Sequence, residues 1–172
     1  MIHDLKQFVP SEVCLSCDGC CRFKEADSAW RPKVSGREIK AAKQSDLFLK
    51  IYTKERVDST ERVKTVSCEG HNFCSFLDQK TNACRVYDQR PFECRLYPFV
   101  LTKKENKTVV TAHHHCPFVQ QKRQTREFND YAKYLEGFFK TKGVLDFVKE
   151  NSGAWEEYPD DQDQLEYLFD IC

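Results

Sequence analysis

The sequence predicts a small α+β domain of short β-hairpins and helices, stabilised by metal ions, with C-terminal helices packed on it. Three observations support this fold class: ten cysteines in 172 residues, short β-branched segments between Val63 and Cys116, and a helical period after Cys116. We expect a single domain over residues 1–172. Within it, a cysteine-cluster metal-binding region covers 14–118 and a helical C-terminal extension covers 119–172.

The first helix is predicted by a capping box. Ser35 stands at the cap position and Glu38 follows three residues later, a spacing that satisfies two backbone N–H groups reciprocally. The helix should run to about Gln44, with Ile39 and the pair Ala41–Ala42 on its inner side. A further helical turn or two is expected over 46–52.

Two β-hairpins are predicted in the middle of the chain, because β-branched and aromatic residues flank polar turns there. The first pairs Phe73–Leu77 with Arg85–Tyr87 around a turn at Gln79–Asn82. The second pairs Leu96–Leu101 with Thr108–Ala112 around a turn at Lys103–Asn106.

A helical face is predicted after Cys116-Pro117. Aromatic and aliphatic residues recur there at steps of three and four, as on one side of a helix: Phe128, Tyr131, Tyr134 or Leu135, and Phe138. Gly143 is expected to break this helix, Val144–Lys149 to form another short helix, and Leu165–Phe169 to form a last amphipathic segment.

Charge and hydropathy limit the classes of partner. Lys plus Arg number 27 and Asp plus Glu number 27, so no net field attracts nucleic acid or an anionic membrane. No apolar stretch approaches the roughly 18 residues of a membrane-spanning helix. The first twelve residues lack the basic and then apolar pattern of a signal peptide, so we expect a cytoplasmic protein. In a reducing compartment, clustered cysteines indicate metal or redox chemistry.

The cysteine run at the N-terminal end carries the strongest chemical signal. Its pattern is Cys14-x-x-Cys17-x-x-Cys20-Cys21, and Cys-x-x-Cys spacing brings two thiolates within reach of one ion. Consecutive side chains on an extended backbone point to opposite sides. Cys20 and Cys21 therefore suit two sites, or a multinuclear cluster, better than one mononuclear ion.

More thiols follow along the chain, at Cys74, Cys84, Cys94 and Cys116. Together with the first four they make eight, the ligand count of two four-thiolate sites. Buried free thiols are one alternative, and disulfides are another if the protein is exported.

The ordered motifs resemble a known family, the YkgJ-type CxxCxxCC family. The similarity lies in the N-terminal cysteine run and in three later segments: Cys74-Ser-Phe-Leu-Asp78, Cys84-Arg-Val-Tyr87, and Arg90-Pro91-Phe92-Glu93-Cys94-Arg95-Leu96-Tyr97-Pro98. Cys116-Pro117 resembles the late cysteine after the family's second hairpin. The family is described as a zinc- or iron-chelating domain and includes the flagellin lysine N-methylase group. The resemblance implies that the eight cysteines bind zinc or iron, including the case of a 4Fe–4S cluster.

Cationic groups beside the cysteines are candidates for the outer sphere of the metal. Thiolate sites carry negative charge and are stabilised by N–H donors and cations. Arg90 and Arg95 are the preferred candidates, because Pro91 stiffens the segment between them. The alternative is that they pair with surface carboxylates.

Several further metal-ligating residues stay open at this stage. Cys68-x-x-His71-x-x-Cys74 has the spacing of a mixed site, although a spare thiol and a surface histidine are the simpler interpretation. His113 and His115 would share a face of a strand, and Cys172 would be a free terminal thiol.

Two main functional hypotheses follow. The first is a metal-binding module whose ions are structural or serve metal handling, since closed four-thiolate coordination leaves no open position for substrate. The second is an iron–sulfur redox protein or a protein-modifying enzyme of the lysine N-methylation kind. A thiol oxidoreductase using Cys14 and Cys17 is a third reading, but its βαβ context is missing. Catalytic residues, substrate, protein partner and native metal stay open.

Overall fold

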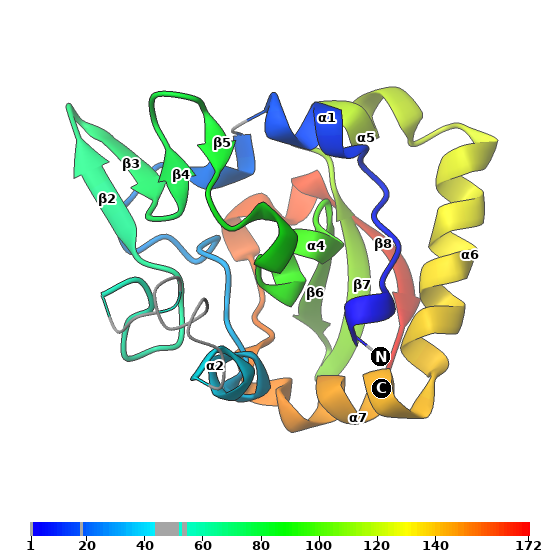
Figure 1. Cartoon of the computed structure of the whole chain (residues 1–172). Helices are drawn as coiled ribbons and strands as arrows, with labels where there is room; N and C mark the ends of the chain where they lie inside the picture. The colour runs from blue at the N-terminus through cyan, green and yellow to red at the C-terminus, as the bar shows by residue number, and fades with distance from the viewer. Residues whose placement is uncertain (1, 18, 44–51, 53–54) are drawn as a thin grey trace. The chain divides into compact units, whose positions relative to one another are not determined.

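The computed structural model describes residues 2–17, 19–43, 52 and 55–172 (Figure 1). Short helices and three small antiparallel sheets confirm the predicted α+β class. The chain divides into two compact units. Unit 1 combines Met1–Val9 with Arg95–Cys172, and unit 2 is the segment Pro10–Cys94 between them. The prediction of one domain over 1–172 stays a prediction.

Unit 2 is built from short elements. Its helical segments are α1 (Ser11–Leu15), η2 (Gly19–Cys21), α2 (Gly36–Lys43), η3 (Tyr87–Gln89) and the start of α4 (Phe92–Leu96). Its strands are β1 (Arg22–Phe23), β2 (Thr65–Cys68), β3 (His71–Cys74), β4 (Leu77–Asp78) and β5 (Ala83–Cys84). They form a three-stranded sheet in the order β1-β3-β2 and the two-stranded pair β4-β5.

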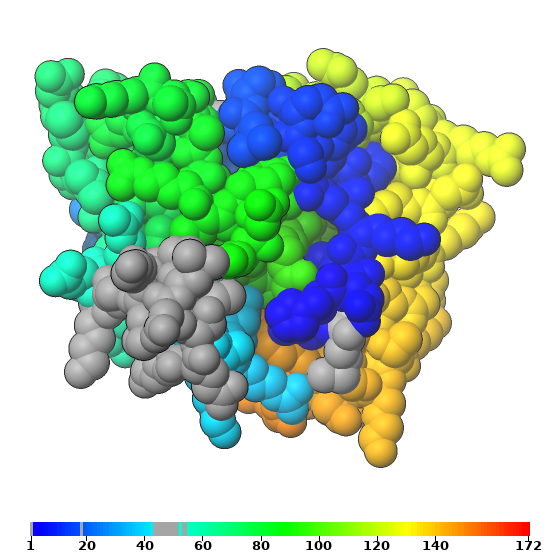
Figure 2. All heavy atoms as spheres, viewed as in Figure 1, coloured from blue at the N-terminus to red at the C-terminus, as the bar shows by residue number. Residues whose placement is uncertain are grey.

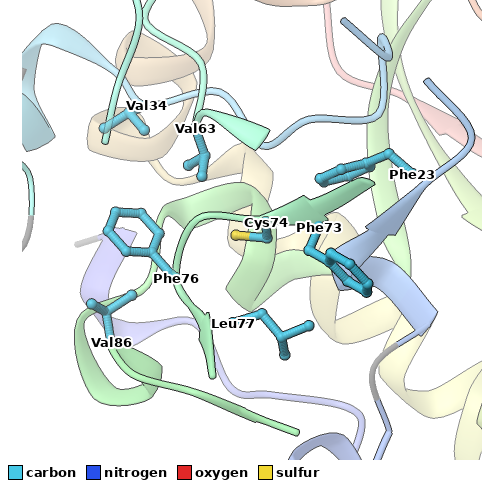
Figure 3. Packing of buried hydrophobic residues seen from close by; sticks show 8 residues of the cluster. All are labelled: Phe23, Val34, Val63, Phe73, Cys74, Phe76, Leu77 and Val86. Carbon is cyan, nitrogen blue, oxygen red and sulfur yellow. The ribbon is translucent and has the colours of Figure 1, made fainter. Parts of the chain in front are cut away.

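The hydrophobic core of unit 2 is small and contains a thiol. Its buried residues are Phe23, Val34, Val63, Phe73, Cys74, Phe76, Leu77 and Val86 (Figure 3). Cys21 and Cys84 are partly buried and pack against this cluster. The apolar core and the candidate metal ligands therefore share residues, so loss of one affects the other.

The predicted capping box is confirmed. The Ser35 backbone N–H donates to the Glu38 carboxylate at 2.8 Å, and the Glu38 N–H donates back to Ser35 Oγ at 3.3 Å. Helix α2 follows, with Ile39 against the core and Ala42 buried, whereas Ala41 is exposed. The segment predicted as helical at 46–52 lies outside the described residues except for Tyr52.

The hairpins of unit 2 differ in part from the prediction. The expected hairpin exists, but it is reduced to β4 and β5, with Leu77 opposite Cys84. Phe73 and Cys74 belong instead to an earlier hairpin of β2 and β3. Its two-residue turn, Glu69–Gly70, has positive φ at both positions, which matches the right-handed twist of the strands.

Unit 1 contains the second three-stranded sheet, in the order β6-β7-β8. Its strands are β6 (Phe99–Lys104), β7 (Lys107–His113) and β8 (Leu165–Asp170). Its α-helical segments are the end of α4, α5 (Pro117–Lys122), α6 (Arg126–Lys140) and α7 (Lys142–Glu150). Its 3-10 helices are η1 (Ile2–Asp4), η4 (Ser152–Ala154) and η5 (Pro159–Gln164). The second predicted hairpin is confirmed as β6 and β7. Its turn is Glu105–Asn106, again with positive φ at both residues.

The C-terminal part is α-helical only as far as Glu150, and the two 3-10 helices η4 and η5 follow. Helix α6 buries the predicted Phe128, Leu135 and Phe138, and Thr125 caps it by accepting from the Phe128 N–H. The helix ends before Gly143, which lies in α7. Residues 165–170 form strand β8 and not a helix, because the edge of β7 offers them a full set of backbone hydrogen-bond partners.

The N-terminal segment of unit 1 is held by aromatic contacts. Phe8 packs edge-on against Phe99 and Phe128, with ring centres 5.5 and 5.9 Å apart. The Tyr131 hydroxyl donates to the Lys6 carbonyl, and burial raises the pKa of that phenol. Ile2, Phe8 and Val9 are buried and thus belong to the core of unit 1.

Candidate metal centre

Seven of the eight predicted cysteine ligands lie in unit 2, on short or irregular elements. They are Cys14 in α1, Cys17 after it, Cys20 and Cys21 in η2, Cys74 at the end of β3, Cys84 at the end of β5, and Cys94 in α4. Backbone hydrogen bonds between nearby residues place Cys14 in one helical turn: the Cys14 and Val13 N–H groups both donate to the Pro10 carbonyl. The Cys17 N–H then donates to the Cys14 carbonyl at 3.2 Å, which curls the Cys-x-x-Cys segment.

The thiols of the N-terminal run act on one another electrostatically. A hydrogen bond with Cys21 is the largest cause that raises the pKa of the Cys20 thiol, and burial and the Cys21 and Cys17 thiols add to it. The residue surface of Cys20 is nevertheless exposed, so the crowding is around its thiol. The pKa of Cys14 is raised by burial first and then by Cys20.

The later thiols belong to the same group. Burial, with smaller contributions from the Cys84 and Cys20 thiols, raises the pKa of Cys74 to about 12. Burial also raises the pKa of Cys94 well above its ordinary value, with Cys74, Cys20 and Cys84 acting in the same direction. The pKa values of Cys74 and Cys94 are therefore each raised by thiols that are distant in the sequence.

Arg90 is the cation of this thiol group. It is buried, its guanidinium carbon lies 3.8 Å from the centre of the Tyr87 ring, and its Nη1 donates to the Tyr87 carbonyl at 3.2 Å. Its charge opposes the effect of burial by lowering the pKa of both Cys14 and Cys84. This placement agrees with the role predicted for Arg90, a cation in the outer sphere of a thiolate-bound metal. Its effect on a bound metal stays a prediction.

Tyr87 is a residue of the site that the sequence reasoning missed. It carries the stacked guanidinium, and a hydrogen bond from it lowers the pKa of the Cys14 thiol. The spacing Tyr87-x-x-Arg90 was the available signal, since an arginine three residues after an aromatic ring in a tight turn can fold back on it.

The donor chemistry fits a thiolate-bound metal, but the thiols are not preassembled around a point. All ten cysteines lie in described parts of the chain and are free thiols. Among the described residues, no group of three or more Cys, His, Asp or Glu side chains is close enough to hold one ion. Binding would therefore require rotation of thiols that already lie within electrostatic range of one another.

The mixed site considered around Cys68 is not formed. Cys68 pairs with His71 and Thr65 pairs with Cys74 across the hairpin of β2 and β3. Side chains alternate between the two faces of a strand, so His71 and Cys74, three residues apart, point to opposite faces. Cys68 and His71 are exposed, whereas Cys74 is 7% exposed.

Three predicted residues lie in unit 1. Cys116 is buried at the start of α5, and Arg95 donates from Nη1 to the Ile2 carbonyl at 3.1 Å. His113 is buried, its Nδ1 lies 3.2 Å from the Tyr97 hydroxyl, and its ring centre lies 4.9 Å from that of His115. Strand β7 ends at His113 and His115 lies in the turn that follows, so the two rings come together through this turn and not on a shared face of a strand. The metal roles of Cys116 and Arg95 stay predictions.

A comparison with family models gives a match over residues 13–117, to the family CxxCxxCC, described as "Putative zinc- or iron-chelating domain". The chain belongs to the CxxCxxCC family. The matched segment contains the seven predicted cysteine ligands of unit 2 and Cys116, so metal binding is the function shared with this CxxCxxCC domain. Comparisons with curated proteins and with solved structures gave no match. Within the described part of this CxxCxxCC protein, every helix is too short or too polar to cross a bilayer.

Proposed function

We propose that the thiols of unit 2 bind zinc or iron as thiolates and that the ions stabilise this unit. The observation that carries the proposal is the convergence of cysteines from four separate segments, whose thiols alter one another's pKa across up to 74 residues of chain, from Cys20 to Cys94. The proposed ligands in unit 2 are Cys14, Cys17, Cys20, Cys21, Cys74, Cys84 and Cys94. Cys116 is the proposed eighth ligand.

The small core of unit 2 supports a structural role for the ions. Its strands span two to four residues, and the buried cluster in Figure 3 includes a candidate ligand. A structural zinc ion contributes on the order of 10 kcal/mol to the folding of small domains. That energy would compensate for a core of this size. Thiolate ligands also favour a reducing compartment, and we propose the cytoplasm.

The charge of the site supports thiolate ligation as well. Two four-thiolate zinc sites are anionic, and Arg90 provides a buried positive charge beside Cys14 and Cys84. The Arg90 side chain is held by its hydrogen bond to the Tyr87 carbonyl and by stacking on the Tyr87 ring, so it would stay in place as the thiols lose their protons.

The test compares two cysteines of one hairpin. Cys74→Ser should lose at least one bound ion per chain and be less stable, whereas Cys68→Ser should keep the wild-type metal content. Metal and acid-labile sulfide are measured by elemental analysis and a visible spectrum on anaerobically purified protein. Equal metal content in Cys74→Ser and wild type would contradict the proposal. Iron with matching sulfide would instead favour an iron–sulfur redox or protein-modifying role.

A further inference from the structure

A pocket of about 650 Å³ opens in unit 2 beside the thiol group. Its wall includes Cys74, the apolar side chains of Val66 and Leu77, and the charged turn between β4 and β5. That hairpin reaches the molecular surface, where Figure 2 shows it in green at the upper left. The volume lies in the range of small-molecule sites. Cys74 is the one residue of this wall that the metal-binding proposal uses.

Cations outnumber carboxylates around the pocket. Arg56, Lys80 and Arg85 line it together with Glu55 and Asp78. Arg56 is fixed by donation from Nη1 to the Ser75 carbonyl at 2.6 Å, and its guanidinium carbon lies 5.8 Å from the centre of the Phe76 ring. One of the three cations is thus held in place before any ligand binds.

The Asp78 carboxylate is already engaged by its own turn. Its Oδ1 accepts the Lys80 N–H at 2.9 Å and the Thr81 N–H at 3.4 Å. Its Oδ2 lies 3.9 Å from Arg85 Nε, in a pair whose Arg85 side chain is 51% exposed. An exposed pair at this distance is weak, so Arg85 can turn toward a competing anion. The Lys80 ammonium lies on the exposed turn and acts on Asp78 through space.

The apolar part of the wall selects the kind of anion. Val66 is 46% exposed, which is unusual for a β-branched residue in a strand, and Leu77 forms the base of the adjoining hairpin. Apolar surface next to charged groups suits a ligand with a hydrocarbon body and an oxyanion at one end. Leu77 is 5% exposed and already covered by the protein, whereas a fully hydrated inorganic ion would leave Val66 uncovered.

We propose that this pocket binds a small organic oxyanion, a carboxylate or a phosphomonoester. Lys80 and Arg85 bind the oxyanion, Arg56 contributes a fixed positive charge, and the exposed side chain of Val66 covers the hydrocarbon body. The site goes beyond metal binding and requires no ion. Because Cys74 lies in its wall, a bound ligand would also cover one edge of the thiol group.

The test titrates succinate and glycerol 3-phosphate into the full chain as purified, at constant ionic strength, by calorimetry and by amide chemical shifts. Binding of succinate alone identifies a carboxylate site, and binding of glycerol 3-phosphate alone identifies a phosphomonoester site. Glycerol is the uncharged control. Loss of one charge-assisted contact weakens binding by about tenfold or more. Lys80→Glu should therefore bind at least that much more weakly, and Arg85→Gln should behave alike.

The matched control is Lys40→Ala, on the exposed surface of α2 and away from the pocket wall. It should bind as wild type does. The proposal is overturned if neither anion binds to wild type, or if Lys80→Glu and Lys40→Ala bind equally. Metal content is measured on the same samples. It should be equal in all of them, so a failure of metal binding would be recognised separately from a failure of the pocket.

Discussion

Arg90 is a buried cation whose closest chemical neighbours are an aromatic ring and thiols. Cation–π stacking on Tyr87 holds the guanidinium in place and does not neutralise it, so its positive charge also acts on Cys14 and Cys84. Outer-sphere residues of metal sites typically contribute about 10–100-fold to metal affinity. Arg90 should therefore act on the metal through the pKa of its ligands.

Replacing Arg90 tests this role. Arg90→Gln should lower metal affinity about tenfold. The metal affinity of Arg90→Lys should lie between those of Arg90→Gln and wild type, because lysine keeps the charge but loses the planar stack. Competition with a chromophoric chelator measures the affinity. Arg126→Gln, at an exposed position of α6, is the control and should match wild type. A normal affinity in Arg90→Gln with an intact circular dichroism spectrum would contradict the prediction.

Asp58 links the acid stability of unit 2 to a single carboxyl group. Burial alone would raise its pKa, but hydrogen bonds from Thr60, the Arg31 guanidinium, and the N–H groups of Thr60 and Arg62 lower it well below the ordinary value. A carboxyl group with a lowered folded pKa stabilises the protein above its unfolded pKa of about 3.9, and the contribution is lost as pH falls below that value.

Asp58→Asn should therefore be less stable than wild type at pH 6, with a difference that shrinks below pH about 4. Urea unfolding at several pH values measures the free energy of unfolding. Metal loss at low pH affects both proteins alike, so only the difference between them is interpreted. A difference that stays constant from pH 6 to pH 3 would rule out the linkage.

At the scale of single elements, the start of helix α2 is fixed by its N-terminal cap. Besides the reciprocal Ser35 and Glu38 bonds, the second oxygen of Glu38 accepts the Phe92 N–H at 2.7 Å. One carboxylate thus closes the start of α2 and satisfies an N–H at the start of α4. The two short helices are fixed to each other by a single side chain.

Ser35→Ala should lower the free energy of unfolding by about 1 kcal/mol, the usual contribution of a serine N-cap. Chemical denaturation of the metal-loaded protein measures it. Ser152→Ala, at an exposed position of η4, is the control and should differ little from wild type. If both variants have the same stability, the cap does not contribute as the geometry indicates.

The elements that could be predicted are those determined by nearby residues. Residues close together in the sequence determine three of them: the Ser35–Glu38 box, the apolar face of α6 and the hairpin of β6 and β7. Strand β8 pairs with β7 across more than fifty residues, so its amphipathic pattern alone could not distinguish strand from helix. The turn Glu69–Gly70 carried a glycine signal, but Cys74 was assigned to the following hairpin.

The candidate site was likewise predictable only in part. Cysteine spacing predicted which thiols matter, since metal ligation is limited to few residue types. It could not predict that the thiols stop short of a closed site, because that depends on side-chain packing against the core of unit 2. The opposite directions of Cys68 and Cys74 follow from strand register, which was missed.

At the scale of the whole molecule, the two units should respond differently to metal removal. Unit 2 has strands of two to four residues, whereas unit 1 has strands of six and seven residues and an aromatic core around Phe8. Unit 2 therefore has less packing energy to rely on when its ions are removed.

Treatment with a chelator under reducing conditions should strongly increase amide hydrogen exchange in β3 and β5, while β6 and β7 keep most of their protection. Mass spectrometry of peptides from each unit measures this, with the metal-loaded protein as reference. Uniform loss of protection over both units would contradict a stabilising effect confined to unit 2.

The order of the segments along the chain has a consequence for synthesis. Phe8 belongs to unit 1, but its partners Phe99 and Phe128 come after the whole of unit 2. A ribosome adds about 5–20 residues per second, so the interval between the addition of Cys94 and that of Phe128 is on the order of 2–7 seconds. The thiols of unit 2 therefore meet the cellular metal pool before the rest of unit 1 exists, and a cell short of metal would accumulate nascent chains with an unfolded first half.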